Sequence, residues 1–226
     1  MSIIRLENIF KSFGERNLFT NLSMEIDQGD FVSIMGESGA GKTTLLNIIG
    51  MLEQPDKGSV TICGQQSLGF SSRTATMLRR NHISYLMQNY GLVDTETVEY
   101  NLAISARFKK LSKAQKKLLF SSALEQIGLP GYEKRKIYTL SGGEQQRAGI
   151  ARSIITSPAI VMADEPTGNL DTATGEMVLT LFQKLFRQNG TTLMIVSHDD
   201  DMPRHVDRTI RLSDGALIGE EINACI

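Results

Sequence analysis

The fold of this chain is decided by the stretch Gly36-Glu37-Ser38-Gly39-Ala40-Gly41-Lys42-Thr43-Thr44. The apolar run Phe31-Val32-Ser33-Ile34-Met35 precedes it, and Leu45-Leu46-Asn47-Ile48-Ile49 follows it with the pattern of a helix. Strand, glycine-rich loop and helix in this order match the phosphate-binding pattern G-x-x-x-x-G-K-S/T, in which backbone N–H groups and a helix N-terminus surround a phosphate. The sequence therefore predicts an α/β protein that binds a nucleotide.

The side chains of this loop have separate predicted roles. Lys42 can reach the β- and γ-phosphates of a nucleotide as a compact positive charge. The Thr43 hydroxyl can ligate Mg²⁺, and the Thr44 hydroxyl can donate a further hydrogen bond to phosphate. The glycines remove the Cβ atoms that would block the phosphate. We expect nucleotide contacts from the whole loop: Gly36, Glu37, Ser38, Gly39, Ala40, Gly41, Lys42, Thr43 and Thr44.

Composition limits the class of protein. With 226 residues, 41% of them hydrophobic, the chain can bury a large core, and its formal net charge of −1 gives no global attraction to nucleic acid. The two cysteines, Cys63 and Cys225, suit neither a disulfide framework nor a metal site. No apolar run approaches the roughly 18–20 residues of a membrane-spanning helix, and the first residues lack the long apolar region that is typical of a signal peptide. We therefore expect a cytosolic chain that binds no nucleic acid and meets a membrane only through a partner.

Alternation and turn residues predict further strands around the loop. Residues 3–9 and 22–26 are expected to form strands near the N-terminus, and residues 209–219 a hairpin around Ser213-Asp214-Gly215. Residues 89–138 differ from the rest because they are helix-forming and lysine-rich, with almost no strand signal. They are predicted to form a helical insert.

Basic residues follow one another in this insert without an acidic residue between them. Two interpretations remain open: a solvated helix face, or proximity to anionic lipid headgroups. The basic residues concerned are Arg107, Lys109, Lys110, Lys113, Lys116 and Lys117.

Two carboxylates end the buried-type strand of residues 159–165. Because successive side chains of a strand point to opposite faces, Asp164 and Glu165 are expected to have different roles. Asp164 can complete a Mg²⁺ site opposite Thr43, and Glu165 can accept a proton from the water that attacks the γ-phosphate. The sequence thus predicts both a metal ligand and a general base.

Three further side chains are candidates for the same site. His198 follows the strand of residues 191–197 and can bond a γ-phosphate oxygen while orienting the water held by Glu165. Gln88 follows the strand of residues 83–87, so its carboxamide oxygen can touch Mg²⁺ or the attacking water. Phe13 can stack on an adenine ring, although an aromatic residue beside a glycine more often serves plain packing.

A second glycine motif, Leu140-Ser141-Gly142-Gly143-Glu144-Gln145-Gln146-Arg147, opens a helical pattern. Ser141 can cap that helix, and the glycines expose N–H groups at its positive end. One nucleotide needs only one phosphate loop, so this motif is expected to close on the nucleotide of another subunit; a well-capped turn is the alternative. The nucleotide-binding residues expected on this side are Ser141, Gly142, Gly143, Glu144 and Asp171.

The order of these motifs resembles the ATP-binding-cassette transporter ATPases over essentially the whole chain. The phosphate loop, Gln88, Ser141 to Arg147, Met162-Ala-Asp-Glu-Pro-Thr-Gly-Asn-Leu-Asp171 and Ser197-His198 carry the resemblance. It implies ATP and Mg²⁺ as cofactors, ATP hydrolysis, a membrane permease as partner, and a head-to-tail homodimer with ATP between the phosphate loop of one subunit and residues 141–143 of the other. It also makes Phe13 the adenine-stacking position, where the family more often has tyrosine.

The resemblance implies an α/β P-loop NTPase core, in which helices flank a mixed sheet, with an N-terminal antiparallel β region and an inserted α-helical subdomain. Residues 1–226 are expected to form a single nucleotide-binding domain, with residues 1–88 and 139–226 as its catalytic core and residues 89–138 as its helical subdomain. The expected location is cytoplasmic, peripheral on the inner face of the cell membrane.

Residues 165–171 and the short chain without a regulatory tail resemble the macrolide-export and lipoprotein-release class, and residues 87–94 resemble antimicrobial-peptide or bacteriocin export ATPases. The expected function is export or extraction of a peptide, drug or lipoprotein. The alternative is a cassette that drives a permease-linked signalling or cell-wall hydrolase complex without transport. Cassette ATPases of DNA repair or translation usually carry tandem cassettes or a long coiled-coil insertion, and this chain has neither.

The insert and the loop after Gln88 are expected to receive a cytoplasmic helix of the permease. Residues 89–100 supply Tyr90, Leu92, Val93 and Val98 as apolar anchors between polar residues. The alternative is that these residues pack the insert against its own core.

Overall fold

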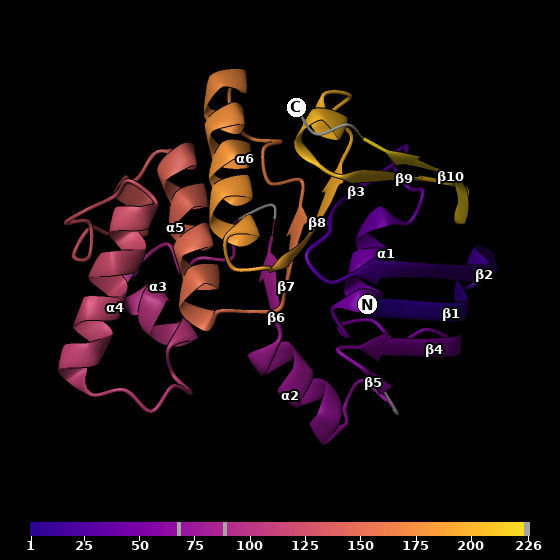
Figure 1. The fold of residues 1–226 in the computed structure, drawn as a ribbon, viewed down its shortest axis with the longest axis horizontal. Coiled ribbons are helices and arrows are strands. Elements are labelled where there is room, and N and C mark those ends of the chain that lie inside the picture. Colours follow the sequence, from indigo (N-terminus) through magenta and orange to yellow (C-terminus); the bar gives the residue numbers. More distant parts are fainter. Residues whose placement is uncertain (67–68, 88–89, 224–226) are drawn as a thin grey trace.

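The computed structural model describes residues 1–66, 69–87 and 90–223, whose strands form two sheets (Figure 1). The strands are β1 (Ser2–Phe13), β2 (Arg16–Asp27), β3 (Phe31–Met35), β4 (Lys57–Ile62), β5 (Gln65–Gln66), β6 (Ile83–Leu86), β7 (Ile160–Asp164), β8 (Thr192–Ser197), β9 (Arg208–Ser213) and β10 (Ala216–Ile222). The helices are α1 (Lys42–Ile49), α2 (Arg73–Asn81), α3 (Val98–Ser105), α4 (Lys113–Gln126), α5 (Gly142–Thr156) and α6 (Thr172–Arg187), with 3₁₀ turns η1 (Ile137–Thr139) and η2 (Met202–His205).

The larger sheet has the strand order β10-β9-β3-β8-β7-β6. The pairs from β9 to β6 are parallel, and β10 is antiparallel to β9, so the sheet is mixed as predicted. Helices cover it, which is why β3 and β8 are buried along their whole length and read as continuous apolar runs. Because the carboxyl ends of parallel strands meet at one edge, the segments that follow β3, β7 and β8 converge there.

The smaller sheet has the order β2-β1-β4-β5 and is antiparallel, which confirms the predicted N-terminal β region. Its first two strands are longer than predicted, since β1 pairs with β2 as far as Phe13 opposite Arg16. The register of β1 against β2 shifts twice between Leu6 and Phe10, and Asn8 has a φ of 52°. These β-bulges interrupt the alternation of side chains, so the sequence pattern ends before the strand does.

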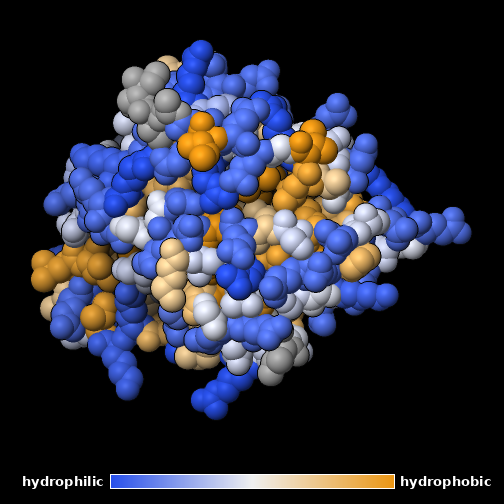
Figure 2. Space-filling model, turned by 45° about the vertical axis from the view of Figure 1, so that its right-hand side comes forward, coloured by the Kyte–Doolittle hydropathy of each residue, from blue (hydrophilic) through white to orange (hydrophobic). Residues whose placement is uncertain are grey.

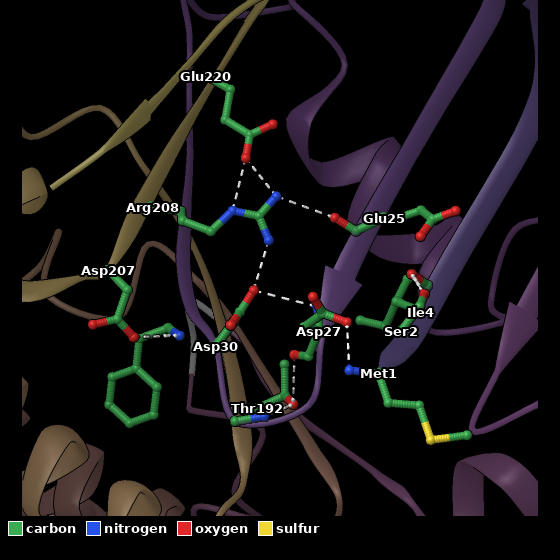
Figure 3. Close-up of polar contacts among 12 residues, drawn as sticks. Met1, Ser2, Ile4, Glu25, Asp27, Asp30, Thr192, Asp207, Arg208 and Glu220 are labelled. Carbon is green, nitrogen blue, oxygen red and sulfur yellow. Dashed lines mark hydrogen bonds and ion pairs between the residues drawn. The ribbon is translucent and has the colours of Figure 1, made fainter.

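Polar contacts of Arg208 join the two sheets (Figure 3). From β9, its guanidinium donates to Asp30 Oδ2 at 2.6 Å, to Glu220 Oε1 at 2.7 Å and to the backbone oxygen of Glu25 at 3.3 Å. Glu220 lies on β10 of the larger sheet, and Glu25 lies on β2 of the smaller sheet. The arginine therefore fixes the end of the hairpin β9–β10 beside the turn that leads into β3.

Two hydrophobic clusters form the core. The first places α1 between the sheets, where Leu45 and Ile49 pack with Ile4 and Leu6 of β1 and with Val32 of β3. The second joins α3, α4, α5 and α6 to the other face of the larger sheet, on the left in Figure 1. On the face drawn in Figure 2, hydrophobic side chains lie in several separate places among hydrophilic ones. Among the described residues, no helix is both long and apolar enough to cross a membrane.

The nine-residue helix α2 was not predicted. Ser72 caps this helix by accepting a hydrogen bond from the backbone N–H of Ala75. The buried residues of the helix are Ala75 and Leu78. Two buried positions define no clear helical period, so the pattern was too weak to read. The predicted insert contains α3 and α4 within its described part, residues 90–138, which have no strand. Its division from a catalytic core stays a prediction.

Candidate active site

A cavity of about 660 Å³ lies at the edge where the segments after β3, β7 and β8 converge. This volume falls within the roughly 300–1,000 Å³ that is usual for small-molecule sites. The residues that line the cavity are Phe13, Arg16, Leu18, Gly36, Glu37, Ser38, Gly39, Gly41, Lys42, Thr43, Thr44, Glu165 and His198. The structure therefore brings most of the predicted nucleotide and catalytic residues together in one place, whereas Ala40 is buried behind them.

Glycine is required in the loop for two different reasons. A Cβ atom at Gly36 would lie 2.1 Å from the backbone oxygen of Leu212, so β9 leaves no room for a side chain. Gly41 has a φ of +102°, a left-handed conformation, and its Cβ would meet the ring of Phe19 at 2.9 Å. Gly41 caps α1 without a side-chain acceptor. The first-turn N–H groups of α1 thus have no side-chain cap, which suits an anion at this end of the helix.

Lys42 bridges the loop that it belongs to. Its Nζ atom donates to the backbone oxygen of Gly36 at 2.7 Å and to that of Glu37 at 2.9 Å. An ammonium group has three N–H donors, so two close the loop and one is left for a phosphate oxygen. The lysine is 8% exposed, so its charge is held in place before any ligand arrives.

Thr43 and Asp164 face each other across a candidate Mg²⁺ site. The Thr43 hydroxyl donates to Asp164 Oδ1 at 3.5 Å, a distance at which one cation could bind both oxygens. Burial raises the pKa of Asp164 and the charge of Glu165 adds to this, while the hydrogen bond from Thr43 and the charge of Lys42 lower it. A hydroxyl and a carboxylate are oxygen ligands of the kind that Mg²⁺ prefers, so the residues present fit this ion.

Glu165 and His198 form a second pair in the cavity. His198 Nδ1 lies 2.9 Å from Glu165 Oε1, and both side chains line the cavity. Glu165 has a φ of 47°, which is uncommon for a residue with a side chain; such strain costs roughly 1–3 kcal/mol and occurs often at active sites. The carboxylates of Asp164 and Glu165 have different partners, but strand alternation is not the cause, because β7 ends at Asp164 and Glu165 lies beyond it.

The second glycine motif lies away from this cavity. It forms the start of α5, while Asp171 caps the start of α6 by accepting from the backbone N–H of Thr174 at 3.0 Å. The two helix starts are neighbours, because a Cβ at Gly143 would lie 2.5 Å from Thr174 Cγ2. Among the described residues, none of those predicted for this side lines the cavity: Ser141, Gly142, Gly143, Glu144 and Asp171.

The start of α5 is held by a capping box. Ser141 Oγ accepts from the N–H of Glu144, and Glu144 Oε2 accepts from the N–H of Ser141 at 2.8 Å. Tyr132 donates its hydroxyl to the other carboxylate oxygen at 2.8 Å. The backbone hydrogen bond from Ser141, followed by the one from Tyr132, lowers the pKa of Glu144. The carboxylate thus fixes the helix start, whose first N–H groups have no acceptor within the helix.

One predicted residue cannot be placed, and two residues of the cavity were not predicted. Gln88 lies outside the described residues. Arg16 and Leu18 line the cavity, and Arg16 Nη2 donates to the backbone oxygen of Gly39 at 3.0 Å. Arg16 pairs with Phe13 across the β1–β2 hairpin. Gly14 could have predicted this pairing, because its turn brings the two residues together. The predicted strand ended at residue 9, before this turn.

We expect Arg16→Ala to weaken ATP binding by about threefold to tenfold, because the loop loses one hydrogen bond that holds Gly39, worth roughly 0.5–1.5 kcal/mol. Calorimetric titration with ATP measures the change. Arg204→Ala is the matched control, since Arg204 is an exposed arginine that pairs with Asp201 and does not line the cavity. Equal affinities for the Arg16 variant and the unaltered chain would exclude this role for the arginine.

Comparisons with known proteins agree with this geometry. A family model described as ABC transporter matches residues 19–168. The chain is 37% identical to an ABC transporter ATP-binding protein of Mycobacterium tuberculosis over 96% of this chain and 89% of that protein. It is also 37% identical to the lipoprotein-releasing system ATP-binding protein LolD of Porphyromonas gingivalis, over 96% of this chain and all of that protein.

Two further comparisons concern a longer relative and a solved structure. The macrolide export ATP-binding/permease protein MacB of Mannheimia succiniciproducens is 37% identical over 97% of this chain, which spans 35% of that protein. A dimeric ATP-binding cassette of Methanocaldococcus jannaschii, bound to ADP and Pi in a post-hydrolysis state, superposes with a TM-score of 0.89 at 35% identity, covering 99% of this chain and 100% of that one.

Proposed function

This chain belongs to the ABC transporter family, and on that premise we propose that it is the ATPase subunit that powers a membrane permease for export or extraction of a peptide, drug or lipoprotein. The observation that carries this function is the single cavity into which the phosphate loop, Glu165 and His198 converge. ATP is the substrate of such a site, and Mg²⁺ is its metal. Relatives named for macrolide export and for lipoprotein release favour transport over a signalling role.

We assign the binding of ATP and Mg²⁺ to three groups of residues, of which Asp164 lies outside the cavity lining. The loop N–H groups and the third N–H of Lys42 hold the β- and γ-phosphates. Phe13 is 51% exposed at the end of β1 and offers its ring face to the adenine. Thr43 and Asp164 hold Mg²⁺, which neutralises charge on the phosphate oxygens when it is bound.

The hydrolytic step is assigned to the pair of Glu165 and His198. The Glu165 carboxylate accepts a proton from the water that attacks the γ-phosphorus, and the bond from that phosphorus to the leaving oxygen of ADP breaks. The hydrogen bond with His198 holds this carboxylate in position. When both ring nitrogens carry protons, His198 also donates from Nε2 to a γ-phosphate oxygen.

We propose a head-to-tail homodimer in which residues 141–143 of one subunit close the ATP site of the other. The start of α5 presents N–H groups at a positive helix end, yet it does not line the cavity of its own chain. A partner subunit's α5 is therefore needed to cover the γ-phosphate. The dimeric form of the similar cassette with ADP and Pi supports this arrangement.

The surface proposed for the permease differs from the predicted one, because it keeps Val93, adds Tyr100 and leaves out Tyr90, which is partly buried. Val98 was wrong as an apolar anchor, because it starts α3 and is fully buried in the second hydrophobic cluster. Leu92 is partly buried against the same cluster. Val93 and Tyr100 are 41% and 49% exposed, so they are the anchors that a helix of the permease could reach. On this proposal the chain lies at the inner face of the membrane through its permease.

Val93→Glu and Tyr100→Glu are expected to reduce permease-stimulated ATP hydrolysis to the basal rate, because a charge buried against an apolar helix face is unfavourable. The measurement compares the ATPase rate of the isolated chain with that of the complex with its copurified permease. Ile218→Glu is the control, since Ile218 on β10 is 65% exposed and lies outside residues 89–100, the segment predicted to receive the permease helix. Full stimulation of both variants would place the coupling surface elsewhere.

A further inference from the structure

Positive charge is concentrated in two stretches of the sequence that contain no acidic residue. Residues 58–93 hold three arginines, and residues 100–124 hold six lysines and arginines. Nine of the 24 basic residues thus lie in acid-free sequence, and the remaining 15 share the rest of the chain with all 25 acidic residues. A net charge of −1 therefore conceals a strong separation of charge.

The fold brings α2 of the first stretch against the loop between α3 and α4 of the second. The Arg80 guanidinium at the end of α2 lies 3.9 Å from the ring centroid of Phe108, in the loop between α3 and α4, and Arg107 lies 5.9 Å from it. Arg79 and Ser105 line one cavity beside this contact. We define the basic surface by its exposed cations on α2, on this loop and on α4: Arg73, Arg80, Arg107, Lys110, Lys113 and Lys117.

The charges of the basic surface are not neutralised by the protein itself. Within the part of the chain that the structure describes, none of the nine basic residues takes part in an ion pair. The acid-rich remainder behaves differently, since Arg187, Arg208 and Arg211 each pair with a carboxylate. The basic surface therefore keeps its full attraction for an external anion.

Apolar side chains stand singly among these cations. Phe108 is 59% exposed although two arginines lie over its ring. Met77 is 40% exposed on α2, four residues after Arg73 and three before Arg80, so it shares their helix face. Long cationic stems beside isolated apolar side chains are typical of a surface that lies against lipid headgroups.

We propose that the basic surface binds the anionic phosphate headgroups of the membrane that contains the permease. The location of that membrane rests on the proposed function, but the contact itself needs neither the permease nor ATP. Binding to an acidic segment of a protein would call for a groove that collects the charges, whereas these charges are spread over α2, the following loop and α4. Each Lys or Arg within a Debye length, about 10 Å, of an anionic membrane surface raises the partition of the protein from water onto that membrane by roughly fivefold.

The test is cosedimentation of the full chain with vesicles of phosphatidylglycerol and phosphatidylcholine, and with vesicles of phosphatidylcholine alone. We expect binding to the anionic vesicles only, released by added salt. The triple variant Lys110→Glu, Lys113→Glu, Lys117→Glu should bind the anionic vesicles at least about 100-fold more weakly, given roughly fivefold for each positive charge removed. Lys134→Glu, Lys136→Glu, Lys184→Glu is the matched control, with the same net charge placed on exposed lysines outside the basic surface. It should bind within about threefold of the unaltered chain.

Other results would overturn the proposal. Equal binding to both kinds of vesicle would do so. Equal losses of binding in the two triple variants would also do so, because the effect would then depend on total charge and not on its position. Tighter binding to polyglutamate than to vesicles, lost in the first variant, would assign the surface to an acidic protein instead. Phe108→Ser keeps every charge and should bind anionic vesicles about fivefold more weakly, which tests the surface even if the triple variant does not fold. The basal ATPase rate of each sample tests the proposed function separately.

Discussion

Glu165→Gln is expected to lower the turnover number for ATP hydrolysis by about 10²–10⁴-fold, the usual worth of a positioned general base. Glutamine has the shape of glutamate but cannot accept the proton of the attacking water. ATP affinity should change little, because the phosphate loop and Lys42 keep their hydrogen bonds. Steady-state phosphate release and calorimetric titration with ATP measure the two quantities.

The same variant should accumulate as a dimer with ATP trapped between its subunits, detected by size-exclusion chromatography with light scattering. Glu176→Gln is the matched control, since Glu176 pairs with His205 away from the cavity and should hydrolyse ATP at the unaltered rate. A Glu165→Gln variant with nearly unaltered turnover would assign the general base to another group.

Lys42→Ala and Ser141→Arg should each reduce ATP hydrolysis to a small fraction of the unaltered rate, for different reasons. Lys42 lines the cavity of its own chain, so its loss should weaken nucleotide binding. Ser141 lies at the start of α5 outside that cavity, so an arginine there should spare binding to the monomer and block closure of the dimer. Nucleotide titration of monomers, with a separate measurement of dimer formation, distinguishes the two defects.

Ser141→Arg also removes a helix cap, which by itself costs about 0.5–2 kcal/mol. Ser112→Arg is the control, because Ser112 forms the same kind of capping box at the start of α4 and takes no part in the proposed dimer. It should lose similar stability and keep its ATPase activity. Equal loss of activity in the two variants would show that Ser141→Arg acts by destabilising the fold and not by blocking the dimer.

Mixing the Lys42 and Ser141 variants gives the sharper test of composite sites. In a head-to-tail heterodimer one site carries both changes and the other carries neither, so some ATP hydrolysis should return. The rate should scale with the fraction of heterodimers, measured with two affinity tags. Absence of activity in confirmed heterodimers would contradict composite sites that work independently.

Sequence reasoning worked best where chemistry and conformation are encoded in consecutive residues. The phosphate loop and the helix cap of Ser141 follow from local patterns, whereas the role of Glu144 in the same capping box was not predicted. It failed where burial decides the outcome. Val98 was expected at the surface, but its position in α3 turns it into the core. The prediction ended the first strand before Phe13, because β-bulges break the alternation on which strand prediction depends.

The sequence by itself determined the phosphate loop and the types of side chain available for binding and proton transfer, since neighbours in the chain stay neighbours in the fold. The tertiary structure alone decided which distant segments meet. The order β3-β8-β7 brings His198 and Glu165 to the loop, the β1–β2 hairpin adds Arg16, and the placement of α5 keeps Ser141 out of its own cavity. The packing of α2 against the loop after α3 likewise makes one basic surface from two stretches. These distances depend on strand pairing and core packing, which no contiguous run of residues specifies.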